Sequence, residues 1–267
     1  SLHTLLIQNN GFNHLLGNIT LFSCLQVDHG NVAILSENTL FNSSLAAFLV
    51  LEGPILGRFE FTSNIINLSD FSFGAVRINI EKAADPWFIT NNNITHTLLY
   101  PDSLLFQAER YAMISFSVKN FSKNSDMYFS GNLFQEVVLR LADDRPTSTE
   151  LDLIAIQTYQ ALRLYGNSYS SVKLLSPGSL LNFFNTRTAM IYNGEFNTIT
   201  FNSKYGLIRT CSNDTTVFSS SFRNIKNTGP SGLLYLPSND QYRILEIQHC
   251  LFENLTSEYN LKADEQQ

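Results

Sequence analysis

The sequence contains few charged residues for its length, and cations are the scarcer kind. Lys and Arg number 17 and Asp and Glu number 23 among 267 residues, which gives a net charge of -6. Nucleic-acid binding depends on clustered cations that displace counterions from phosphates, and binding to anionic lipid depends on a polybasic segment. We therefore expect neither nucleic acid nor a lipid surface as a partner.

Long apolar runs are also missing. The best one, at residues 45–51, falls far short of the roughly 20 residues that a membrane helix needs. No membrane insertion is therefore expected in this segment. The N-terminus lacks the basic start, apolar core and cleavage site of a secretory leader and opens on a strand-like sequence. Either the numbering begins after processing, or the chain is a segment of a longer one.

Cysteine is scarce, and its placement does not suggest a metal site. The three cysteines, Cys24, Cys211 and Cys250, form an odd count. Neither the His249-Cys250 pair nor Cys24 with His29 has the paired spacing of a closed zinc site. We expect free, buried thiols rather than a disulfide between Cys211 and Cys250, and neither a metal nor a cofactor.

The chain is rich in Asn, Ser, Thr and Phe, and these residues recur in one pattern. Two alternating apolar residues precede a small or polar residue, and a large apolar residue follows two positions later, as in LEIQHCLFENL at 245–255. The copies at 36–41 and 192–196 are interpreted as carrying one extra residue. The large apolar residues are expected to point inward as a stacked ladder, formed by Phe12, Phe41, Ile66, Ile94, Phe134, Tyr169, Phe196, Phe222 and Phe252.

An Asn precedes the ladder residue in several copies. Asn tolerates left-handed backbone angles and suits a tight bend between two strands. If coils stack about 4.8 Å apart, each amide can also bond to the Asn above and below. We therefore expect an interrupted ladder of structural asparagines at one bend, formed by Asn10, Asn64, Asn92, Asn132 and Asn167.

A second short apolar run lies between successive ladder residues, as at 75–80 and 232–236, and no segment looks helical. A period of about 20 to 50 residues indicates a solenoid. The sequence predicts a right-handed parallel β-helix of about nine coils over residues 1–256. Loop insertions are expected near 98–127 and 142–153, and a polar tail or cap at 257–267. The alternative is a leucine-rich-repeat solenoid, which the irregular repeat lengths disfavour.

The segments at 217–225 and 245–254, with 231–236, resemble the parallel β-helix repeat of pectin-lyase-like proteins. They are most similar to the non-enzymatic versions found in large cell-surface proteins, although few glycines precede the second strand. The resemblance implies a structural or adhesive scaffold, as part of a larger chain or a filament. The alternatives are a polysaccharide lyase or glycoside hydrolase on the same scaffold, or a recognition module similar to leucine-rich-repeat proteins.

Catalysis would require acidic and basic side chains that converge on one sugar bond. The richest group falls in the expected second insertion, where a solvated charged loop explains it without chemistry. No catalytic residue is therefore assigned, and we expect the chain not to be an enzyme. The group comprises Arg140, Asp143, Asp144, Arg145, Glu150 and Asp152.

Seven sequons of the Asn-x-Ser/Thr type are candidate glycosylation sites. A sequence this rich in Asn, Ser and Thr produces many by chance, but the first five follow each other at about one coil. Real glycosylation would place the chain outside the cell or on its surface. The sites are Asn18, Asn42, Asn67, Asn93, Asn120, Asn213 and Asn254.

The ends of a β-helix present unpaired backbone edges, which proteins normally cover. The chain starts within a repeat, and nothing resembling a cap precedes it. We therefore expect end-to-end stacking with other copies or neighbouring segments of the same protein. Carbohydrate is a further possible partner, since outward aromatic residues would offer a surface on which sugars stack.

Overall fold

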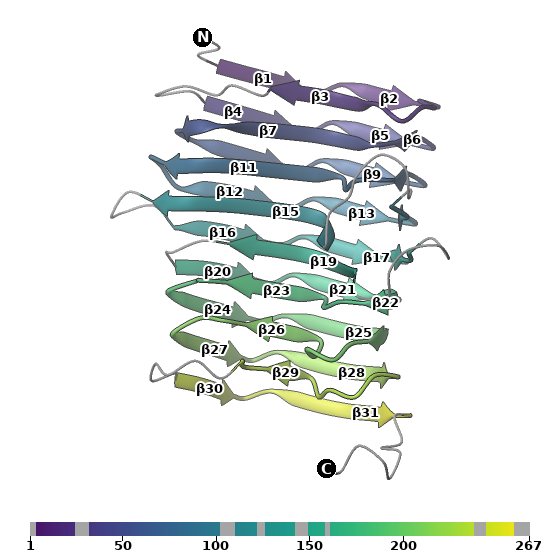
Figure 1. Ribbon diagram of the computed structural model, residues 1–267, viewed down its shortest axis with the longest axis vertical. Coiled ribbons are helices and arrows are strands. Elements are labelled where there is room, and N and C mark those ends of the chain that lie inside the picture. Colours follow the sequence, from purple (N-terminus) through teal and green to yellow (C-terminus); the bar gives the residue numbers. More distant parts are fainter. Residues whose placement is uncertain are drawn as a thin grey trace.

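The computed structural model describes residues 4–24, 32–101, 110–121, 126–141, 149–157, 161–237 and 244–258. This part of the chain forms an all-β parallel solenoid, in which each coil lies on the one before it (Figure 1). Every pairing between its strands is parallel, and the strands make three sheets. The described residues include no helix long and apolar enough to cross a membrane.

The first sheet has nine strands and contains the alternating residues that open each repeat. Its strands are β1 (Thr4–Gln8), β4 (Val32–Ser36), β8 (Phe59–Thr62), β12 (Trp87–Thr90), β16 (Met127–Ser130), β20 (Ala161–Tyr165), β24 (Thr188–Tyr192), β27 (Asp214–Phe218) and β30 (Ile244–Gln248).

The second sheet has fourteen strands in two rows, which merge where β25 pairs with both β21 and β22. The first row is β2 (Gly11–Asn13), β5 (Thr39–Phe41), β9 (Ile65–Asn67), β13 (Asn93–Thr95), β17 (Leu133–Gln135), β21 (Ser168–Ser170), β25 (Glu195–Asn202), β28 (Ser221–Asn227) and β31 (Leu251–Ser257). The second row is β6 (Ser44–Leu45), β10 (Asp70–Phe71), β14 (Leu98–Leu99), β18 (Val138–Leu139) and β22 (Lys173–Pro177).

The third sheet has eight strands. They are β3 (Thr20–Cys24), β7 (Ala47–Leu56), β11 (Val76–Ala83), β15 (Arg110–Phe121), β19 (Glu150–Gln157), β23 (Leu181–Phe184), β26 (Ile208–Thr210) and β29 (Leu234–Tyr235). Three sheets around one core rule out the leucine-rich-repeat alternative, in which a single sheet lines a horseshoe. The solenoid completes about eight turns, slightly fewer than the nine coils expected.

The winding is right-handed. In Figure 1 the strands of the third sheet run from right to left in front, and those of the first sheet run from left to right behind them, as the chain descends from its N-terminus. Parallel crossover connections take this hand almost without exception, because right-handed strand twist favours it. The sequence-based expectation of a right-handed β-helix is therefore met by the fold.

A continuous ladder of asparagines lines the bend between the first and second sheets. From Asn10 to Asn132, each Nδ2 donates to the Oδ1 of the Asn in the next coil at 2.9 to 3.1 Å, and Asn167 is the last acceptor. Each of these Oδ1 atoms also accepts the backbone N–H of the Asn above it. Asn38 fills the gap that the sequence pattern left between Asn10 and Asn64, so the ladder is not interrupted in its first six coils.

The left-handed residue of this bend is the one before the Asn, contrary to the expectation that the Asn itself would adopt this conformation. The Asn is selected instead for its amide, which is buried and hydrogen-bonded at both ends. The preceding residues have φ between 47° and 63°, and they are Asn9, Glu37, Ser63, Asn91, Gly131, Gly166, Asn193, Ser219 and His249.

The large apolar residue two positions after the Asn points inward in every coil. Phe134, Tyr169, Phe196 and Phe222 form a stack with ring centroids 4.5 to 5.3 Å apart and planes within 16° of parallel. Each such pair contributes about 0.5–1.5 kcal/mol beyond its burial. The Tyr169 side chain is 1% exposed and its hydroxyl has no partner among the described residues, so burial raises its pKa and keeps it neutral.

One member of the predicted ladder is wrong. Leu40, which is fully buried, pairs with Phe12 and Ile66, whereas Phe41 is half-buried and lies one position later on the outer side. The ladder residue lies two positions after the Asn in this coil, as in the other coils, because Asn38 occupies the Asn position. The copy at Phe196 needs no extra residue either, since Gly194 takes the place of the Asn.

The expected insertions contain regular strands. β15 lies within 98–127 and pairs with β11 and β19, while β19 begins inside 142–153. The remaining parts of both segments, at 102–109, 122–125 and 142–148, lie outside the described residues, as does 259–267 of the expected tail. Strand β31 carries the solenoid to Ser257, one residue into that tail.

The three cysteines are free thiols, in agreement with the expectation from their number. Each is half-buried rather than fully buried. Cys250 occupies the Asn position of the last coil, and its thiol lies 3.3 Å from the Gln248 carbonyl oxygen and 3.5 Å from that of Val217.

Replacing Asn92 tests the ladder. Its Nδ2 donates to the Phe61 carbonyl at 2.7 Å and to Asn132, and its Oδ1 accepts two bonds from Asn64. Asn92→Asp removes both donated bonds and buries a charge, so we expect it to lower the free energy of unfolding by about 3 kcal/mol or more. Asn92→Ser is expected to cost less, because Ser220 fills the same position by bonding Gly194 N and Phe218 O.

Urea denaturation followed by circular dichroism measures both effects. Asn91→Ser is the matched control, since serine already occupies that neighbouring, exposed position at Ser63 and Ser219. Equal losses of stability for Asn92→Asp and Asn91→Ser would show that the amide ladder contributes nothing specific.

Candidate functional site

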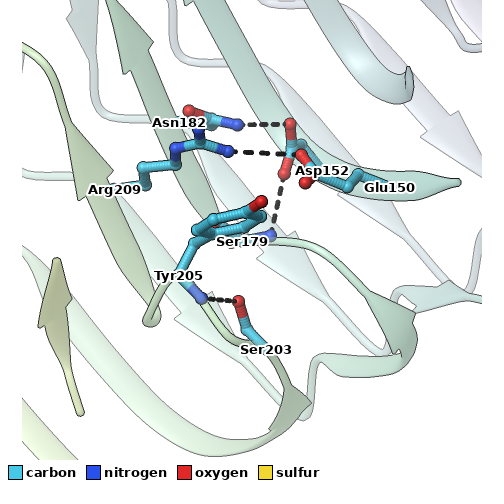
Figure 2. Close-up of polar contacts among 7 residues, drawn as sticks. All are labelled: Glu150, Asp152, Ser179, Asn182, Ser203, Tyr205 and Arg209. Atoms are coloured by element: carbon cyan, nitrogen blue, oxygen red, sulfur yellow. Dashed lines mark hydrogen bonds and ion pairs between the residues drawn. The ribbon is translucent and has the colours of Figure 1, made fainter. Parts of the chain in front are cut away.

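The most concentrated polar cluster lies on the third sheet, where β19, β23 and β26 are neighbours (Figure 2). Glu150 and Asp152 belong to β19, and their exposed fractions are 8% and 0%. The expectation that they lie in a solvated loop is therefore wrong. Both residues are fixed in position because β19 pairs in parallel with β15, which places Glu150 opposite Arg110 and Asp152 opposite Ala112.

Of the other members of this charged group, Arg140 alone belongs to the described part of the chain. Asp143, Asp144 and Arg145 lie outside the described part of the chain. Arg140 follows β18 and lines a different hollow, together with His96.

Asp152 braces the turn that leads into β23. The Ser179 backbone N–H donates to its Oδ1 at 2.8 Å, and the Asn182 amide donates to its Oδ2 at 2.7 Å (Figure 2). Gly178 permits this approach, since a Cβ there would lie 1.8 Å from the Leu151 carbonyl oxygen. Both carboxylate oxygens are therefore engaged with the backbone and side chain of one turn.

Arg209 joins β26 to β19 across the strand between them. Its Nη1 lies 3.3 Å from Glu150 Oε2, and the two side chains are 15% and 10% exposed. The guanidinium lies 3.9 Å from the Tyr205 ring centroid and 5.6 Å from that of Phe184. Tyr205 is itself held by a 2.9 Å bond from its N–H to Ser203 Oγ. The low exposure of both side chains makes this ion pair stronger than a surface pair.

Three buried polar atoms of the cluster have no hydrogen-bond partner among the described residues: Ser179 Oγ, Asn182 Oδ1 and Arg209 Nε. Asn182 and Arg209 are paired across β23 and β26. Asn182 Oδ1 is an acceptor and Arg209 Nε a donor, so a single water molecule or hydroxyl group matches these two.

The cluster is arranged to stabilise the fold, because its hydrogen bonds and ion pair connect β19 to β23 and β26. Glycoside chemistry by paired carboxylates needs two that reach the substrate. Asp152 is fully enclosed and its oxygens are occupied, and Glu150 is held by Arg209. The described residues also contain no group of three or more His, Cys, Asp or Glu side chains placed to bind a metal.

A groove of about 270 Å³ lies beside the cluster on the same outer face. Its floor contains the small side chains Ser115, Ser117 and Ala155, and Arg77 and Phe184 are among the residues around it. Arg77, Ser115, Ala155, Asn182 and Arg209 follow one another in register across five strands. The sequence offered one signal for this groove, because Arg77 interrupts the apolar run at 75–80.

The seven sequons differ in exposure. Asn67 and Asn93 are half-buried, and the Oδ1 of each is buried without a partner among the described residues. Asn42 and Asn254 lie on a second left-handed corner, which follows the strands of the second sheet. The exposed sites are Asn18, Asn42, Asn120, Asn213 and Asn254.

No family model matches the chain, and no curated protein matches its sequence. The parallel β-helix fold agrees with the resemblance noted in the sequence. Membership of the pectin-lyase-like family remains an inference from the repeat pattern.

Replacing Asp152 tests whether its hydrogen bonds stabilise the folded chain. Asp152→Asn removes the negative charge and turns an amide group towards one of its two donors, so we expect a loss of about 2–3 kcal/mol in the free energy of unfolding. Thermal unfolding by circular dichroism provides the comparison. Asp126→Asn is the control, since Asp126 forms a partly exposed pair with Arg163 at 3.0 Å, worth about 1 kcal/mol at most. Indistinguishable variants would contradict the role of Asp152.

Proposed function

We propose that the chain is a structural or adhesive scaffold of the cell surface or extracellular space, as a segment of a larger chain or of a filament, whose end coils stack on other copies or on neighbouring segments of the same protein. The observation that carries the proposal is the exposure of core positions in the last coil. Phe252 is 44% exposed, whereas Phe222, at the same position one coil earlier, is 2% exposed. Ile247 is 42% exposed and its predecessor Val217 is 1% exposed.

The first coil carries the complementary feature. Asn38 and the later ladder asparagines each donate to a backbone carbonyl in the coil before them, as Asn38 does to Ile7. Asn10 is at the same position, but its Nδ2 donates locally to the Gln8 carbonyl. In a stack of copies, Asn10 would find the equivalent carbonyl at Ile247 and would continue the ladder from Cys250. The two ends lie at opposite extremes of the solenoid (Figure 1).

The charges of the two end coils are compatible. Residues 4–24 contain no Lys, Arg, Asp or Glu. Residues 244–258 contain three glutamates, of which Glu253 pairs with Arg223 and Glu258 with Lys226 in the previous coil. Contact between these ends therefore brings no like charges together, and the newly covered surface is largely apolar.

The surface location rests on the sequons. Five of the seven stand in solvent, where the folded chain has room for a glycan. The enzyme alternative is less well supported, because Glu150 and Asp152, the described carboxylates of its acidic group, are enclosed. A polysaccharide lyase or hydrolase would need an acid and a base that reach a bound sugar.

Light scattering after size exclusion, over a range of concentrations, tests the stacking. We expect a mass above the 30.2 kDa of one chain that grows with concentration. Phe252→Lys places a charge in the proposed contact and is expected to return the protein to one chain. Leu175→Lys is the control, since Leu175 is 51% exposed on the side of the solenoid. A wild type that stays at the mass of one chain at all concentrations would refute stacking.

Peptide mass spectrometry on protein from its native source, before and after N-glycosidase treatment, tests the surface location. We expect sugars at Asn18, Asn42, Asn120, Asn213 or Asn254 and lower occupancy at Asn67 and Asn93, whose amides are partly enclosed. Seven unmodified asparagines would remove the argument for an extracellular protein.

A further inference from the structure

The groove on the third sheet is bordered by Arg77, which forms no ion pair with a carboxylate among the described residues. Arg58, Arg163, Arg209 and Arg223 each form an ion pair with a carboxylate. No ion pair joins Arg77 to a carboxylate among the described residues. Its guanidinium lies 4.4 Å from the Phe73 ring centroid and borders the groove. A guanidinium that packs over a ring face still has N–H groups that can donate to an incoming oxyanion.

The charges near Arg77 leave it a cation. Burial lowers the pKa of its guanidinium, while Glu52 and Tyr111 act in the opposite direction. Glu52 lies on the neighbouring strand β7, where it faces Asn79 rather than Arg77 in the strand register. A guanidinium is not deprotonated in proteins, so Arg77 stays a cation at neutral pH.

Neutral hydrogen-bonding groups continue from Arg77 along the groove. The Ser117 hydroxyl donates to Gln157 Oε1 at 3.3 Å, which leaves the Gln157 amide nitrogen as a donor towards solvent. Ser115 and Ala155 have small side chains, so the groove stays open between Arg77 and Phe184. The groove therefore joins one cationic end to a row of uncharged polar groups beside an aromatic ring.

We propose that this groove binds a small organic carboxylate that carries hydroxyl groups. The carboxylate would pair with Arg77 in the planar geometry that guanidinium favours, and the hydroxyls would bond Ser115 and Gln157. A volume of about 270 Å³ is near the lower limit of ligand pockets and suits a molecule of about six carbons. This site lies on the side of the solenoid, so it is independent of stacking through the ends.

Gluconate and sorbitol form a matched pair of probes, because both are six-carbon polyols and only gluconate has a carboxylate. Isothermal titration of the whole chain is expected to give saturable binding of gluconate and none of sorbitol at the same concentrations. Arg77→Gln is expected to weaken gluconate binding at least tenfold. Arg163→Gln is the control, since Arg163 also lies near a tyrosine ring but is already paired with Asp126.

Ala155→Met tests the groove without changing a charge. Ala155 is 7% exposed on its floor, and the longer side chain is expected to fill the space and abolish gluconate binding. Unfolding midpoints close to the wild type would show that each variant is folded. Gluconate binding that equals sorbitol binding, or that survives both Arg77→Gln and Ala155→Met, would overturn the proposal.

Discussion

The fold depends on hydrogen bonds that each coil makes only with its neighbours. All of the strand pairings among the described residues join one coil to the next, so the backbone groups of each strand depend on the adjacent coils. Stability in such a chain is a sum of contacts between adjacent repeats. The Asn ladder strengthens this one-dimensional order, because each amide bonds both the previous and the next coil. A fault in one coil therefore weakens the two on either side of it.

The same constraint determines which side chains the core accepts. Rings in neighbouring coils lie at about the separation of two strands, and the stack from Phe134 to Phe222 has this spacing with nearly parallel planes. The buried Tyr169 hydroxyl shows that ring shape outweighs one unpaired polar atom at this position. The buried carboxylate of Asp152, by contrast, has a hydrogen-bond donor for each of its two oxygens.

Sequence reasoning identified the solenoid and most of its ladders because these depend on spacing within one coil. It misplaced Phe41 because the bend was interpreted as one residue too long, and it missed Asn38 for the same reason. It treated Glu150 and Asp152 as loop residues because a charged segment precedes them. The groove was not predictable in this way: Arg77, Ser115 and Ala155 are 38 and 40 residues apart, and only the register of unequal coils brings them together.

A solenoid has two kinds of surface, and they suit different roles. Its end coils expose the same strand edges and core side chains that are paired and buried in the interior. A segment that covers them must therefore resemble another coil, and a second copy of the chain supplies one. The outward residues on the sides of the solenoid are not members of the inward ladders, so Arg77 or an exposed sequon there does not disturb the repeat. Substitutions that alter stacking should therefore leave the groove intact, because the two surfaces share no residue and at least one whole coil lies between the groove and either end.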